Sequence, residues 1–229
     1  APTGQTSIAL SVAAAVLSSD PARSHAAGLA LGLDPGRCYA NAAEMFAAER
    51  SRTDGIDAVA IMTPNDTHYA FAVAALEAGL DVISDKPVSH DFREACDLVA
   101  RTRAGGRLFA IAHGYSAYPM TRYARHLVRD GSLGPVRLVQ VEYIQGGLAA
   151  KIEDGPQTTR IRWLFDPSRS GLAQVMSAIG CHAQHLALDR TLARGRVADL
   201  LADGNRFAEL HQLREVAVDR VVRHAGHRY

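Results

Sequence analysis

The chain has 229 residues, of which 48% are hydrophobic and 21% are charged, and its formal net charge is +1. A chain of this size and composition can bury the core of one large domain or of two small ones. The basic residues are dispersed, which argues against nucleic acid as a partner. Three isolated cysteines, Cys38, Cys96 and Cys181, form no C-x-x-C pair. This odd count favours a reducing, cytoplasmic setting.

The most apolar run, residues 7–17, predicts a buried strand. It is about half as long as a helix that spans a bilayer. Because no basic segment precedes it, we expect neither a signal peptide nor a membrane partner.

Strands and helices alternate through the first half of the chain. Short apolar runs that stop at turn residues predict strands, and helically periodic runs that stop at glycine predict helices. Ser19 or Asp20 is the predicted N-cap of the first helix, with Pro21 at its first position. The predicted elements are strands at 9–18, 57–64, 81–87 and 107–115, and helices at 21–31, 40–51, 68–79 and 91–106.

This alternation predicts an α/β fold, with a Rossmann-like parallel sheet and helices on both faces. The uninterrupted apolar runs are typical of strands that are covered on both sides. Ligands bind such sheets beyond the carboxyl ends of the strands. Three predicted strand ends carry polar residues there: Thr63-Pro64-Asn65, Asp85-Lys86-Pro87 and His113-Gly114-Tyr115.

The pattern changes after residue 117, and we predict two domains, at 1–117 and 118–229. In the second domain, residues 119–134 predict a helix, and 135–145 alternates as a one-sided strand of a mixed or antiparallel sheet does. Residues 146–170 resemble a loop, and 171–192 predicts a helix that is interrupted near Gly180. The tail, 193–229, has leucines and valines at helical spacing.

One long segment, residues 57–99, resembles the Gfo/Idh/MocA oxidoreductases, relatives of glucose–fructose oxidoreductase and inositol dehydrogenase. In that family a strand ends in a T-P-N-like turn with a nearby histidine, and a later strand ends in E-K-P. Here these are Thr63-Pro64-Asn65 with His68, and Asp85-Lys86-Pro87. The likeness covers roughly residues 13–188 and includes the later runs WLFDPSRSG and IGCHAQHL.

The resemblance implies an NAD(P)-dependent dehydrogenase that acts on a sugar, a polyol or a related hydroxyl compound. It also implies a Rossmann domain followed by a substrate domain, with an open sheet through which relatives often form homo-oligomers. The choice between NAD and NADP stays open, because serines follow the first predicted strand, with Asp20 and Arg23 close by.

Hydride transfer from an alcohol needs a base for the hydroxyl proton and a donor for the developing oxyanion. Lys86 is the predicted donor, and the resemblance implies that it touches both the substrate and the nicotinamide. His182 is the predicted acid–base group, since imidazole titrates near neutral pH. The alternatives are a solvated lysine and a core histidine. We expect no metal, because His182 and His185 lack further spaced ligands.

Further residues are predicted from the strand ends and from the resemblance. Those expected to hold the cofactor, together with Lys86, are Ser18, Ser19, Thr63, Pro64, Asn65, His68, Asp85 and Pro87. Those expected to contact the substrate are His113, Tyr115, Trp163 and Arg169.

Three features depart from the family. Ala178 stands where the resemblance implies an aspartate, four residues before His182. No G-x-G-x-x-G turn follows a first strand, and the tail is unlike the family, so we expect truncation at both ends and an incomplete α+β substrate domain. A catalytically impaired remnant or binding protein of the same fold is therefore an alternative. A Schiff-base role for Lys86 is a third.

Overall fold

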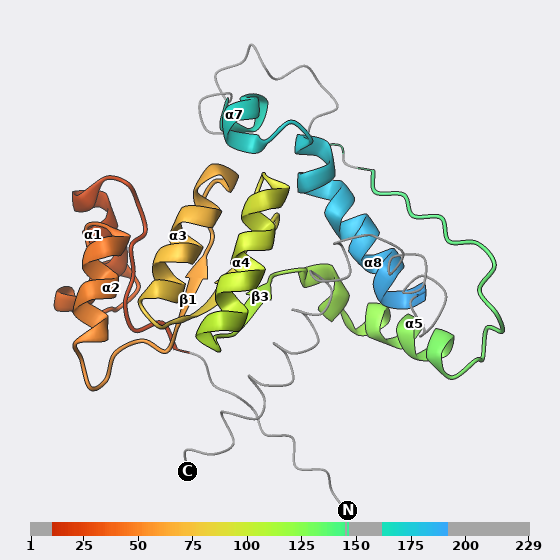
Figure 1. The fold of residues 1–229 in the computed structure, drawn as a ribbon, viewed down its shortest axis with the longest axis horizontal. Helices are drawn as coiled ribbons and strands as arrows, with labels where there is room; N and C mark the ends of the chain where they lie inside the picture. Colours follow the sequence, from red (N-terminus) through yellow and green to blue (C-terminus); the bar gives the residue numbers. More distant parts are fainter. Residues whose placement is uncertain (1–10, 145, 147–161, 192–229) are drawn as a thin grey trace, which may run out of the picture.

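The computed structural model describes residues 11–144, 146 and 162–191 (Figure 1). Three parallel strands form one sheet in the order β1-β2-β3: β1 (Ala58–Ile61), β2 (Asp81–Ser84) and β3 (Phe109–Ile111). The predicted parallel sheet is confirmed, with strands that end before the polar residues at their carboxyl ends. The chain reaches β2 and β3 through helices, as parallel pairing requires.

Two helices, α3 (Asn65–Glu77) and α4 (Phe92–Gly105), lie side by side on the sheet (Figure 1). Their apolar side chains meet those of the strands in one core, which includes Ile61, Ala72, Ala75, Leu76, Val82, Leu98 and Phe109. The alternate strand positions Ala60 and Ile83 are exposed. Within the described ranges, the prediction that these strands are covered on both sides is therefore met on one side only.

The ends of α3 and α4 follow from local hydrogen bonds. The Thr67 N–H donates to the Pro64 carbonyl over 2.9 Å, so α3 begins at Asn65, three residues before its predicted start. The Asp91 carboxylate accepts from the amides of Arg93 and Glu94 and caps α4. Gly106 ends α4 with a φ of 61°, a left-handed conformation that favours glycine.

The first described segment forms less sheet than we predicted. In residues 11–18 the one strand-like contact is a parallel bridge between Ala15 and Cys38, so the extended strand at 9–18 is wrong for its described part. A strand needs a continuous partner, and no other described segment pairs with this one. The helices α1 (Pro21–Ala30) and α2 (Ala42–Arg50) follow, and Asp20 caps α1 as predicted. The short 3₁₀ turn η1 (Pro35–Arg37) lies between them.

Beyond β3 the regular elements of the described chain are all helical. It forms η2 (Gly114–Ala117), α5 (Pro119–Arg129), η3 (Arg162–Phe165), α7 (Pro167–Ser170), a π-helical turn η4 (Met176–Gly180) and α8 (Cys181–Thr191). The predicted interruption near Gly180 is this π-helical turn. The described part of the predicted loop at 146–170 contains η3 and α7, so that prediction is wrong there; the Asp166 carboxylate starts α7 by accepting the Ser168 amide.

The predicted strand at 135–145 is also wrong over its described residues, 135–144, which form no strand. Leu138 is 82% exposed and Ile144 is 89% exposed. The alternating pattern is typical of a strand with one exposed face, but no described segment pairs with these residues through backbone hydrogen bonds. The predicted helical tail, 193–229, lies outside the described residues.

A buried ion pair fixes α2 to the segment before β1. Arg37 donates to both carboxylate oxygens of Glu49, whose side chain is fully buried, and Glu49 also accepts from the Tyr39 hydroxyl and the Ile56 amide. Burial would raise the pKa of Glu49, but the hydrogen bonds from Arg37 and Tyr39 outweigh it and hold this pKa below its usual value.

Replacing Glu49 with alanine is expected to lower the free energy of unfolding by about 3 kcal/mol, because it leaves the Arg37 charge largely uncompensated. The contribution of Glu49 is present above its unfolded pKa of about 4.3 and is lost as the pH falls through its lower folded pKa. Urea unfolding measures both effects. Glu77→Ala, which removes an exposed partner of Arg101, is the control; an equal loss in both variants would contradict the account.

Candidate functional site

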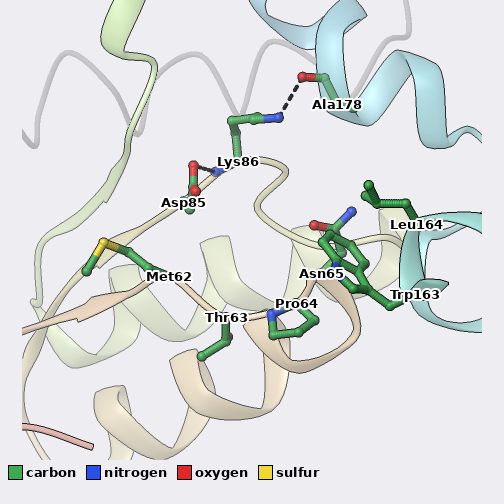
Figure 2. A pocket seen from close by; sticks show the side chains of 9 residues that line it. All are labelled: Met62, Thr63, Pro64, Asn65, Asp85, Lys86, Trp163, Leu164 and Ala178. Atoms are coloured by element: carbon green, nitrogen blue, oxygen red, sulfur yellow. Dashed lines mark hydrogen bonds between the residues drawn. The ribbon is translucent and has the colours of Figure 1, made fainter. Parts of the chain in front are cut away.

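A pocket of about 450 Å³ opens at the carboxyl ends of β1 and β2 (Figure 2). It brings the two turns of the sheet edge together with η3 and the π-helical turn, which follow about 100 residues later in the chain. Its lining residues are Met62, Thr63, Pro64, Asn65, Asp85, Lys86, Trp163, Leu164 and Ala178. Thr63, Pro64, Asn65, Asp85, Lys86 and Trp163 among them were predicted to be site residues.

The end of β2 sets the position of Lys86. The Asp85 amide donates to the Ile61 carbonyl over 2.8 Å and continues the ladder for one residue. The Asp85 carboxylate then accepts the Lys86 amide over 2.7 Å, and the peptide bond between Lys86 and Pro87 is cis. Lys86 therefore lies two residues beyond the end of β2, directly at the ligand edge of the sheet.

The Lys86 ammonium points across the pocket toward the π-helical turn (Figure 2). Its Nζ donates to the Ala178 carbonyl over 2.6 Å. Among the described residues, no carboxylate lies within ion-pair distance of Nζ. Lys86 is thus a half-buried cation held by a neutral acceptor, which differs from the freely solvated strand end that was the alternative.

His182 follows Ala178 by one helical turn, on α8. Its side chain is buried, and its ring packs edge-on against Tyr115, with the ring centroids 4.7 Å apart. No described residue forms a hydrogen bond with its Nδ1. Burial lowers the pKa of His182, and the positive charge of Lys86 lowers it further. His182 is therefore neutral at neutral pH and is competent to accept a proton.

An aromatic cluster surrounds His182. The hydroxyl of Tyr115 shares a hydrogen bond with that of Tyr143, and this bond, together with burial, raises the pKa of Tyr115. His113 stacks on His185, with centroids 4.0 Å apart, and lies edge-on to His182 at 5.7 Å. The predicted substrate residues His113 and Tyr115 thus lie beside His182 and not on the lining of the pocket at Lys86.

His68 joins the two turns of the sheet edge. Its side chain is 1% exposed, and its two ring nitrogens each lie 2.7 Å from a carbonyl oxygen, Nδ1 from that of Pro87 and Nε2 from that of Thr63. His68 thus ties the turn that follows β1 to the turn that follows β2. His68 is not among the lining residues of the pocket, although we predicted that it faces the cofactor.

Residues 3–113 match the family model GFO_IDH_MocA, described as an oxidoreductase family with an NAD-binding Rossmann fold. The chain belongs to the Gfo/Idh/MocA family. This confirms the resemblance seen in the strand-end motifs and the Rossmann fold.

Relatives of this Gfo/Idh/MocA chain extend the match beyond the sheet. The uncharacterized oxidoreductase YfiI of Bacillus subtilis is 32% identical over 200 residues, which are 87% of this chain and 50% of that protein. An inositol dehydrogenase homolog of Azotobacter vinelandii, complexed with NAD⁺, is 35% identical with a TM-score of 0.75, over 80% of this chain and 46% of that one. The complex of an inositol dehydrogenase homolog of this organism with NADH and myo-inositol is 34% identical with a TM-score of 0.71, over 81% of this chain and 46% of that one. The chain thus spans about half the length of these relatives.

Two long-range contacts hold the segment of Trp163 against the sheet edge. The Asn65 amide group donates to the Ser170 carbonyl over 3.3 Å, and Arg169 Nε donates to the Asp66 carboxylate over 3.1 Å. Arg169, a predicted substrate residue, is therefore an ion-pair partner of Asp66 and does not line the pocket. In this Gfo/Idh/MocA protein it fixes the wall that carries Trp163.

Ser18 and Ser19 lie on the surface before α1, away from the lining of the pocket. The Ser18 hydroxyl accepts from the Asp20 amide over 3.1 Å and from Arg23 Nε over 3.0 Å. Their expected contact with the cofactor stays a prediction.

Sequence reasoning missed three lining residues, Met62, Leu164 and the carbonyl of Ala178. Met62 precedes Thr63 and Leu164 follows Trp163 in the sequence, so both could have been predicted as neighbours of predicted site residues. Nothing in the sequence indicates a backbone acceptor at Ala178. Over the described ranges, no group of three or more potential metal ligands occurs, and no helix is long and apolar enough to cross a membrane.

Proposed function

We propose that this chain transfers a hydride between a nicotinamide cofactor, NAD or NADP, and a hydroxyl-bearing carbon of a sugar or polyol. Residues 1–117 hold the dinucleotide, and 118–229 contribute the substrate side. One observation carries the proposal: Lys86 Nζ donates to the carbonyl of Ala178, one helical turn before His182, so a donor at the ligand edge of the sheet lies close to a buried imidazole.

The residues present fit the nicotinamide half of the cofactor. The pocket is large enough for a ring and its ribose, and its polar groups follow β1 and β2, where Rossmann folds bind ligands. We assign Thr63, Pro64, Asn65, Asp85 and Lys86 to this half. Ser18 and Ser19 remain assigned to the adenosine side. Among the described residues, no glycine with positive φ lies between a strand and the following helix, so no pyrophosphate turn is assigned.

The chemistry divides between two side chains. The bound nicotinamide would accept the hydride from the substrate carbon. Lys86 donates a hydrogen bond to the substrate oxygen and stabilises the negative charge that develops there. His182 is the assigned base that takes the hydroxyl proton. Trp163 and Leu164 exclude water from one wall of the pocket.

The test is a pair of titrations followed by a turnover assay. NADH and NADPH are expected to change their nicotinamide fluorescence on binding to the purified chain, and the stronger response identifies the preferred cofactor. Oxidation of myo-inositol, glucose or another polyol should then produce the reduced cofactor. If neither dinucleotide binds at millimolar concentration, the proposal is wrong.

Ala178 favours a second candidate, a protein of the same fold that binds its ligands without turnover. A carboxylate at this position would lie beside both Lys86 and His182, and alanine supplies none. Dinucleotide binding without any substrate oxidation would select this candidate.

A further inference from the structure

The Lys86 ammonium forms no ion pair with any described carboxylate. Lys86 Nζ has three N–H donors, and its one hydrogen bond with a described residue goes to the Ala178 carbonyl. The Asp85 carboxylate accepts the backbone amide of Lys86. The side chain at 178, which lines the pocket, is a methyl group. The ammonium is therefore half-buried and has two N–H donors without a partner among the described residues. The Asp85 carboxylate also lines the pocket (Figure 2) but forms no ion pair with Nζ.

A cation in this state attracts an anionic ligand group. Charge-assisted hydrogen bonds are roughly twice as strong as neutral ones, and removal of water strengthens them further. A ligand carboxylate can accept one of the two remaining N–H donors and form the ion pair that Asp85 does not form, which leaves the other donor for the reacting oxygen. A phosphate carries about twice the charge of a carboxylate and needs more donors than this one ammonium offers.

We propose that the pocket selects sugar acids, in which a carboxylate pairs with Lys86 while a neighbouring hydroxyl is the reacting group. Ala178 is the specificity-determining residue, because an acidic side chain there would take the place of the ligand's carboxylate. This inference rests on the proposed function for its reaction but concerns substrate binding, which can be measured without a cofactor.

The chain contains a built-in probe of this pocket. Trp163 is its one tryptophan and lines the pocket. D-gluconate and D-glucitol share their hydroxyl stereochemistry and differ only in a carboxylate in place of a hydroxymethyl group. Each is titrated into the full chain at pH 7 while Trp163 fluorescence is recorded. A third titration, with glucitol 6-phosphate, tests whether a phosphate group binds in place of a carboxylate.

Gluconate is expected to bind at least about tenfold more tightly than glucitol or its phosphate, and to lose this advantage in Lys86→Met and at high salt. Ala178→Asp should remove the preference, whereas Ala173→Asp adds the same charge at an exposed position and should keep it. Equal affinity for gluconate and glucitol in the wild-type chain, or preference for the phosphate, would overturn the inference, whether or not the variants fold. NADH binding fails or succeeds independently, so the two proposals are tested separately.

Discussion

Replacing Lys86 with methionine is expected to lower kcat/KM for the sugar or polyol substrate by about 100-fold or more. Methionine keeps most of the length of the side chain but removes the donor to the substrate oxygen and the charge beside His182. The loss should appear mainly in kcat, because charge on the substrate oxygen develops in the transition state. Steady-state assays at saturating cofactor measure this effect.

Arg107→Met is the matched control for Lys86. Arg107 is an exposed cation that donates to the Gly79 carbonyl over 2.8 Å, before the amino end of β3 and so at the other edge of the sheet. Its replacement should leave kcat/KM unchanged. If both variants retain wild-type activity, Lys86 does not contact the reacting atoms.

Replacing His182 with alanine is expected to lower kcat by a factor of about 10² to 10⁴, the usual contribution of a general base. The direction of the pKa shift of His182 predicts how the rate changes with pH. Since burial and then Lys86 lower the pKa of His182 from 6.5, wild-type kcat/KM should be flat near neutral pH and fall only at lower pH, as the pH drops through this lowered pKa. The fall reflects protonation of the base.

His126→Ala is the control for His182. His126 is an exposed histidine on α5 that lies near Asp130. Its loss should change neither the rate nor the profile. An acid limb that survives in His182→Ala would assign the titration to another group and contradict the role of His182.

The sheet edge could be predicted because chain order determines it. Apolar runs joined by helices require parallel strands, and parallel strands place Thr63, Asn65 and Lys86 at one edge. The contact of Lys86 with Ala178 could not be predicted, because it depends on the path of a π-helical turn and uses a backbone carbonyl, which every residue possesses. The same holds for the link from Asn65 to the Ser170 carbonyl.

The two wrong strands share one physical cause. Both predicted runs have the side-chain pattern of strands, but their described parts, 11–18 and 135–144, have no described neighbour that completes a ladder of hydrogen bonds. Side-chain pattern reports which face is apolar and does not report whether a partner is present. The ion pair of Arg169 could not be predicted for a related reason: its partner, Asp66, lies 103 residues away in the chain.

Energy transfer from Trp163 to bound NADH tests the central claim most directly, since the claim places the nicotinamide in the pocket that Trp163 and Lys86 line. The predicted result is a saturable loss of tryptophan emission with matching sensitised nicotinamide emission, weakened in Lys86→Met and unchanged in Arg107→Met. Saturable NADH binding without any transfer from Trp163 would place the nicotinamide elsewhere and contradict the account.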